Sequence, residues 1–197
     1  ICLGSRVSGL EIIEEGIQVT TESEGDREVF RYDRVIVAVP VEQASEISTD
    51  LGIDIDGESI PSIVAWGFCD SMPEEAPEGF RIHDLGNSTA MVELSTEMSG
   101  RLIDQDKLSL SKIITDSIGI SGEGWKAHKW RYSRASSGPG SVVTKDGVSF
   151  IGDAFGSDIG SAGASLDSAS RAVSNLHLSV LEPAFGRRPV QSSLYDW

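Results

Sequence analysis

The chain has 197 residues, 39% of them hydrophobic, and its 31 acidic residues outnumber 16 basic ones to give a formal charge of −15. Such acidity argues against nucleic acid or an anionic membrane as a partner, because both require a cationic surface. Two cysteines are too few for a disulfide framework, no apolar run is long enough to span a bilayer, and no signal peptide is evident, so we expect a cytoplasmic protein. The first residue is Ile1 rather than Met, which we interpret as a fragment or a processed subunit.

The first fifty residues predict mainly strands. Residues 6–22 alternate between apolar and polar and indicate two strands, and 28–32 add a third, so that an antiparallel meander is expected. Residues 35–39 are all apolar and rich in valine, which is typical of a strand buried on both faces of a parallel sheet. Pro40 ends that strand, and 41–48 predict a short helix.

The middle of the chain has a different character, with more strands and one clear helix. Residues 108–118 carry apolar side chains at helical spacing. The remaining apolar runs are read as strands at 62–69, 80–83, 90–94 and 126–132. A segment rich in Ser, Gly and Pro at 136–141 is read as a linker.

These elements predict one α/β domain split in sequence by an inserted α+β lobe. The split domain comprises residues 1–54 and 139–182, and the antiparallel lobe comprises 55–138. Residues 183–197 are expected to form a weakly ordered tail.

The most informative segment lies near the C-terminus. Residues 148–153 predict a buried strand that stops at Asp153, and a helix from about 164 to 180 opens on small residues. A helix start presents free backbone N–H groups and partial positive charge, and small residues allow a large flat group to approach. The Asp153 carboxylate is placed to accept hydrogen bonds from sugar-type hydroxyls. The inward side chains of the helix are expected to be Ala169, Ala172, Val173 and Leu176.

Four short elements in this order resemble the C-terminal part of the flavin-containing amine oxidase superfamily, most closely its renalase-like branch. They are Tyr-Asp-Arg-Val-Ile-Val-Ala-Val-Pro at 32–40, Lys-Trp-Arg-Tyr-Ser at 129–133, Phe-Ile-Gly-Asp at 150–153, and Gly163-Ala164. The resemblance covers the chain up to about residue 182. It implies the C-terminal part of a two-lobed FAD/NAD(P)-binding oxidoreductase fold with FAD as the cofactor.

The resemblance also implies a role for individual residues. Val7 lies beside the adenine, and Val39 lines the adenosine–pyrophosphate side. Gly152 and Asp153 bind the ribityl and pyrophosphate region. The turn at Gly163-Ala164 points helix N–H groups at the pyrimidine edge of the flavin, where negative charge develops on reduction. The glycine cluster Gly156, Gly160 and Gly163 favours close approach by a ligand, although Gly160, Gly163 and Ser165 are also ordinary helix-entry residues.

The chain departs from the family pattern in two ways. Asp167 and Ser168 stand where the family shows a small hydroxyl followed by glycine. A G-x-G-x-x-G turn after an N-terminal strand, which opens the dinucleotide-binding βαβ unit, is absent from these 197 residues. This chain alone is therefore expected to hold FAD weakly or not at all.

Trp130 and Tyr132 are the candidate catalytic-site residues. They alternate on one face of a predicted strand, where they either wall a substrate pocket over the flavin or pack in a core. His83 and His177 have no partners at ligand spacing, so no metal site is expected.

The resemblance implies hydride transfer from a C–H next to nitrogen, in an amine or a nicotinamide-type dihydropyridine, to the flavin. The alternative is a non-catalytic interaction subunit, or a remnant domain, that requires a partner chain carrying the dinucleotide-binding half. Because a large exposed apolar surface is rare in monomers, both interpretations predict a partner chain or a homodimer.

Overall fold

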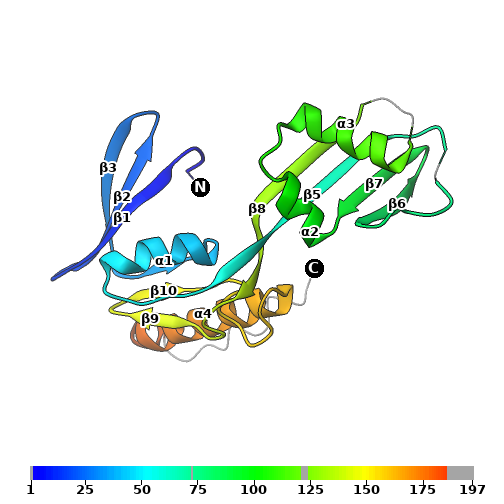
Figure 1. Cartoon of the computed structure of the whole chain (residues 1–197). Coiled ribbons are helices and arrows are strands. Elements are labelled where there is room, and N and C mark those ends of the chain that lie inside the picture. Colours follow the sequence, from blue (N-terminus) through cyan, green and yellow to red (C-terminus); the bar gives the residue numbers. More distant parts are fainter. Residues whose placement is uncertain (1, 72, 121–123, 186–197) are drawn as a thin grey trace. The chain divides into compact units, whose positions relative to one another are not determined.

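The structure is a computed structural model that describes residues 2–71, 73–120 and 124–185. The chain divides into two compact units (Figure 1). The discontinuous unit comprises Ile1–Gly57 and Ser137–Trp197, and the inserted unit comprises Glu58–Ser136. The sequence placed these divisions after residues 54 and 138, within a few residues of where the contacts divide the chain.

The discontinuous unit begins with a meander of three antiparallel strands, as predicted. These strands are β1 (Arg6–Ile13), β2 (Gly16–Ser23) and β3 (Asp26–Tyr32), paired in the order β1-β2-β3. Strand β2 supplies Ile17 and Val19 to the core, whereas every residue of β3 is exposed.

A second sheet of the same unit has the order β4-β10-β9. Strand β4 (Val35–Val37) runs parallel to β10 (Val148–Phe150), and β9 (Val143–Lys145) runs antiparallel to it. All three residues of β10, the central strand of this sheet, are buried. The prediction that 35–39 is buried on both faces is wrong. Strand β4 is shorter and lies at the sheet edge, and Ile36 remains 38% exposed.

Two helices complete this unit. Helix α1 (Val41–Asp50) starts directly after Pro40, and α4 (Ala162–Phe185) follows the loop after β10. Figure 1 shows α1 on one side of β9 and β10 and α4 on the other. Because α4 extends to Phe185, the expected tail begins inside the helix, and 186–197 lie outside the described residues.

The buried side of α4 differs from the prediction. Ala164, Ser168 and Ala172, four residues apart, form its buried stripe. Of the residues predicted to face inward, Ala172 is buried, Ala169 is half-buried and Val173 is exposed. Val173 is exposed because it lies one position beyond Ala172, the last residue of the buried stripe. The side chain of Leu176 is outside the described part.

The inserted unit is a four-stranded sheet with the order β6-β7-β5-β8. Its strands are β5 (Glu58–Phe68), β6 (Phe80–Gly86), β7 (Thr89–Leu94) and β8 (Lys126–Ser137). Strand β7 pairs antiparallel with both β5 and β6. Strand β8 continues to Ser137, so its last residues extend into the predicted linker at 136–141.

Two helices contribute to the core of the inserted unit. Helix α3 (Lys107–Ile118) was predicted, whereas α2 (Thr96–Leu102) was not. The Asp106 side chain accepts hydrogen bonds from the amides of Leu108 and Ser109, which fixes the start of α3. One face of the sheet and α3 together bury an apolar cluster that includes Ile63, Ala65, Val92, Leu110, Ile114 and Ala127.

Within the described residues, no helix combines the length and the hydropathy that crossing a bilayer requires. The described part also contains no group of three or more His, Cys, Asp or Glu residues suited to a metal ion.

Candidate functional site

The end of β10 and the start of α4 lie together in the discontinuous unit. Gly152 adopts φ +138°, a backbone conformation that disfavours side-chain-bearing residues. The Gly152 amide donates to Ser168 Oγ at 3.0 Å. That hydroxyl also lies 3.0 Å from the carbonyl oxygens of Gly152 and Ser165, to one of which it donates. Ser168, a departure from the family pattern, thus ties the strand end to the helix and is fully buried.

The first turn of α4 differs from the prediction at two amides. Ser161 is the N-cap residue, and its Oγ accepts a hydrogen bond from the Ala164 amide at 2.9 Å. The Ser165 amide donates to the Ser161 carbonyl at 3.3 Å. The turn at Gly163-Ala164 was predicted to point helix N–H groups at the flavin, but the chain itself satisfies the amides of Ala164 and Ser165.

Two amides of this turn remain available. Ala162 and Gly163 are exposed, and no acceptor for their amides lies within the described residues. Backbone amides in the first turn of a helix have no intrahelical acceptor. The backbone amides of Ala162 and Gly163 thus form the open end of the helix.

The glycine-rich loop before α4 partly packs on its own helix. A Cβ at Gly156 would lie 2.5 Å from the Cα of Ala164, so this glycine permits contact between loop and helix. Ala164 is consequently buried. The Gly160 amide closes the loop by donating to the Asp153 carbonyl at 3.0 Å.

The carboxylates near this helix end have different surroundings. Asp153 is half-buried and lies three residues beyond β10, which ends at Phe150 rather than at Asp153 as predicted. Asp167 is bonded to Arg171, whose Nε donates to Oδ1 at 3.0 Å. This pairing offsets the negative charge that Asp167 brings to the start of the helix.

The two predicted valine contacts lie elsewhere in the discontinuous unit. Val7 is an exposed residue of β1 at a β-bulge, and Val39 is half-buried two residues beyond β4. The described structure assigns neither a ligand, so their roles remain predictions.

Trp130 and Tyr132 lie on the face of the β8 strand opposite its buried residues. Their exposed fractions are 47% and 39%, so these two side chains do not pack in a core, which was one of the two predicted alternatives. The neighbouring residues point the other way. Lys129 Nζ donates to the carbonyls of Ile103 and Gln105, and Arg131 pairs with Asp104.

The sequence did not reveal the neighbours of these aromatic residues. Trp66 on β5 stacks on His128 with ring centroids 4.5 Å apart and an angle of 14°, and His128 lies 6.0 Å from Trp130. The alternation of 128, 130 and 132 on one strand was a usable signal. The contact with Trp66 required knowledge that β5 and β8 are adjacent.

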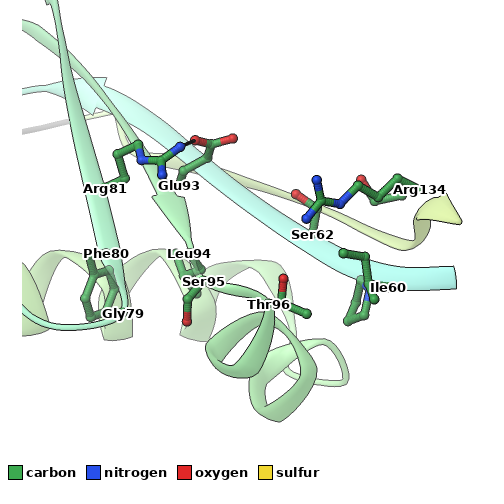
Figure 2. A pocket seen from close by; sticks show the side chains of 12 residues that line it. Ile60, Ser62, Gly79, Phe80, Arg81, Glu93, Leu94, Ser95, Thr96 and Arg134 are labelled. Atoms are coloured by element: carbon green, nitrogen blue, oxygen red, sulfur yellow. Dashed lines mark ion pairs between the residues drawn. The ribbon is translucent and has the colours of Figure 1, made fainter. Parts of the chain in front are cut away.

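The same unit contains an open pocket of about 460 Å³ (Figure 2). Figure 2 shows Arg81 of β6 paired with Glu93 of β7, and Arg134, which lies near the end of β8. None of these residues was singled out from the sequence.

Comparisons with known proteins give a likeness in fold. No protein-family model and no curated protein matches the sequence. Solved structures match, among them the aromatic hydroxylase CabE from angucycline biosynthesis, with 14% identity and a TM-score of 0.55; the match covers 94% of this chain and 40% of CabE. The Diels-Alderase PyrE3 of pyrroindomycin biosynthesis matches with 19% identity and a TM-score of 0.52, over 94% of this chain and 42% of PyrE3. Glycine oxidase from Geobacillus kaustophilus matches with 11% identity and a TM-score of 0.51, over 88% of this chain and 47% of the oxidase.

The chain thus spans less than half the length of each of these three structures. At such identities the likeness concerns the fold. The expected mixed α/β architecture is confirmed at that level: the chain has a mixed α/β fold that corresponds to part of the folds of CabE and glycine oxidase.

Proposed function

We propose that this chain forms part of an FAD-dependent oxidoreductase, in which the discontinuous unit holds FAD and the inserted unit holds the substrate. The observation that carries the proposal is the open start of α4. Two exposed amides, those of Ala162 and Gly163, follow the turn at Gly152 and have no acceptor among the described residues. Backbone amides at a helix start favour a group that becomes electron-rich.

The residues present fit this cofactor, with a narrower set of contacts than the sequence predicted. Ala162 and Gly163 would donate to the pyrimidine edge of the ring. Asp153 would accept hydrogen bonds from ribityl hydroxyls, beside Gly152 and Gly160. Val7 and Val39 would contact the adenosine end. Ala164 and Ser165 would support the helix start through their bonds to Ser161.

When bound, FAD would accept a hydride from the substrate. The proposed donor is a C–H next to nitrogen, in an amine or a nicotinamide-type dihydropyridine, as the resemblance implies. Trp130 and Tyr132 would orient the donor by stacking and exclude water from it. The positive end of α4 would favour the electron-rich form of its ligand.

The proposal is tested by fluorescence titration of the purified chain with FAD, at FAD concentrations high enough to measure the weak binding expected of a chain without the G-x-G-x-x-G turn. The variant Ala162→Pro removes one free amide at the first helical position, where proline is well tolerated. Losing one hydrogen bond to a charged group corresponds to a loss of affinity of roughly tenfold or more. Ala162→Ser keeps the amide and is the matched control. Equal FAD affinity of the two variants would contradict the role assigned to this helix start.

Asp153→Ala is the second variant and tests the ribityl contact. It should lower FAD retention in the complete assembly, in which the dinucleotide-binding half is also present, and unchanged flavin content would remove that role.

A second candidate function is an interaction subunit, and one observation favours it. Strand β4 lies at the edge of its sheet with Ile36 exposed, and no strand of the described residues pairs with its outer side. An open edge of this kind is suited to pairing with another chain. Colourless protein that binds no FAD in the titration and self-associates, with Ile36→Lys restoring the monomer, would support this candidate over the enzyme.

A further inference from the structure

The pocket of the inserted unit lies over one end of its sheet and is lined mainly by polar groups (Figure 2). It is open and has a volume of about 460 Å³, which is enough for a small organic ligand. The hydroxyl-bearing residues Ser62, Thr96 and Ser133 contribute to its wall, together with the charged residues Arg81, Glu93 and Arg134. All of these residues belong to the inserted unit.

The charges of the pocket favour an anion. Arg134 forms no ion pair with any residue that the structure describes. Arg81 has Glu93 as its partner, at 3.7 Å between Nη1 and Oε2, and the Arg81 side chain is mostly exposed. Exposed ion pairs at this separation are weak, so an incoming carboxylate can displace Glu93 at low cost. Two guanidinium groups against one carboxylate leave one positive charge, in a chain whose formal charge is −15.

Aromatic residues outside the pocket share the sheet face of Arg134. Ala127 and Ala135 are buried and mark the covered face of β8. Trp130, Tyr132 and Arg134 occupy alternate positions on the opposite face, where successive side chains are about 7 Å apart. The stacked pair Trp66 and His128 extends this surface onto β5. We call the four rings of Trp66, His128, Trp130 and Tyr132 the aromatic platform.

We propose that this open sheet face binds a planar aromatic carboxylate, with its ring on the aromatic platform and its carboxylate in the pocket of Arg81 and Arg134. Guanidinium groups match a carboxylate through paired hydrogen bonds, and flat rings stack well on tryptophan and histidine. The single net positive charge of the pocket suits a singly charged carboxylate better than a phosphate dianion. The inference rests on the proposed function in that it adds an aromatic carboxylate to the amine or dihydropyridine substrate proposed there, but ligand binding itself requires no flavin.

Binding to the full chain is measured by isothermal titration calorimetry, without added FAD. The probe is 2-naphthoate, which has a planar ring and one carboxylate. The comparison ligands are 2-naphthalenemethanol, which lacks the charge, cyclohexanecarboxylate, which lacks the aromatic ring, and 2-naphthyl phosphate, which has more charge. We expect 2-naphthoate to bind at least about tenfold more tightly than each of the first two and more tightly than the phosphate.

Four variants separate the pocket from general effects of charge. Arg134→Gln and Arg81→Gln should each weaken 2-naphthoate binding by about tenfold. Glu93→Gln should tighten it several-fold, because it removes the competing carboxylate and releases Arg81. Arg101→Gln is the matched control, since Arg101 pairs with Glu97 on α2 and does not line the pocket. Circular dichroism of each variant verifies that its fold is retained.

Three outcomes would overturn the inference. They are equal binding of 2-naphthoate and 2-naphthalenemethanol, equal effects of Arg134→Gln and Arg101→Gln, and weaker rather than tighter binding by Glu93→Gln. Tighter binding of 2-naphthyl phosphate would replace the carboxylate with a phosphate ligand and overturn the stated class. FAD titrations of the same variants distinguish the two proposals. If FAD binds and 2-naphthoate does not, this inference alone is wrong, and if only 2-naphthoate binds, the flavin proposal is wrong.

Discussion

The two units build their sheets in different ways, and each leaves a different kind of group open to a ligand. In the discontinuous unit, β10 is buried on both faces, so its sheet presents few side chains. What remains open around this sheet is backbone, at the strand end and at the start of α4. In the inserted unit, one face of the sheet forms a core and the opposite face carries exposed aromatic and charged side chains. The first unit therefore offers main-chain donors, and the second offers side chains that select a ligand.

The two units also differ in charge. The inserted unit contains 12 acidic and 8 basic residues, and the discontinuous unit 19 and 8, which together make the 31 and 16 of the chain. The resulting formal charges are −4 and −11. An anionic ligand therefore meets less long-range repulsion at the inserted unit, and salt should weaken this difference.

The largest expected effect is on the core of the discontinuous unit. Phe150 is fully buried in β10 and stacks near Phe155 with centroids 6.3 Å apart. Phe150→Ala should lower the free energy of unfolding by about 3–5 kcal/mol, because it removes buried apolar contacts and leaves a cavity. Urea denaturation followed by circular dichroism measures this change. Phe30→Ala, at an exposed position of β3, is the control and should have a small effect.

The same experiment tests whether the two units unfold independently. Three of the four tryptophans lie in the inserted unit, at positions 66, 125 and 130. If the units unfold independently, Phe150→Ala should leave the midpoint of tryptophan fluorescence unchanged. Equal shifts in both signals would show that the units unfold together.

The core of the inserted unit gives the second effect. Leu110 in α3 is fully buried in the apolar cluster, whereas Leu108 in the same helix is 85% exposed. Leu110→Ala should lower the free energy of unfolding by about 2–5 kcal/mol. Leu108→Ala makes the same chemical change at an exposed site and should alter stability little. Tryptophan fluorescence in urea measures both, and similar losses would contradict the assignment of the buried side of α3.

Local patterns in the sequence predicted the meander, α3 and the buried strand at 148–150, because each has a regular spacing of apolar residues. They did not predict which strand lies at the centre of the sheet. Residues 35–39 are more uniformly apolar than 148–150, yet β4 is the edge strand. The position of a strand depends on its neighbours, and β4 and β10 are more than one hundred residues apart in sequence.

The candidate site was predicted in part for the same reason. The strand end at Gly152 and the helix start are local features, and the structure has both. The cap formed by Ser161 was a missed local signal, since serine three residues before Ala164 is typical of an N-cap. The adjacency of Trp66 and His128 and the pocket near Arg134 depend on the order of strands, which spacing alone does not give.

A smaller effect tests the connection between β10 and α4. Ser168→Ala should lower the free energy of unfolding by about 1–3 kcal/mol, because the half-buried amide of Gly152 loses its acceptor. Ser174→Ala, in the same helix, removes an exposed hydroxyl that bonds only the Ser170 carbonyl among described residues, and should be close to neutral. Urea denaturation followed by circular dichroism compares the two. An equally small loss for both would mean that the hydroxyl of Ser168 is dispensable.

The smallest expected effect is the dependence of α3 on pH. Hydrogen bonds from the side chain and the amide of Ser109 hold the pKa of Asp106 below its ordinary value. A carboxyl group with a lowered pKa in the folded state stabilises the fold above the pKa of the unfolded chain, and this contribution disappears as the pH falls through the folded value. The wild type should therefore melt at a higher temperature than Asp106→Asn at neutral pH, and the difference should vanish well below pH of about 4.

The matched control for that measurement is Asp116→Asn, which removes the same charge near the other end of α3. It should raise the melting temperature slightly at neutral pH, since a negative charge near a helix C-terminus is unfavourable. Opposite signs for the two variants would locate the effect of Asp106 in the helix start. A common sign would instead reflect the net charge of the chain, and the inserted unit would then owe its acid sensitivity to overall repulsion rather than to this cap.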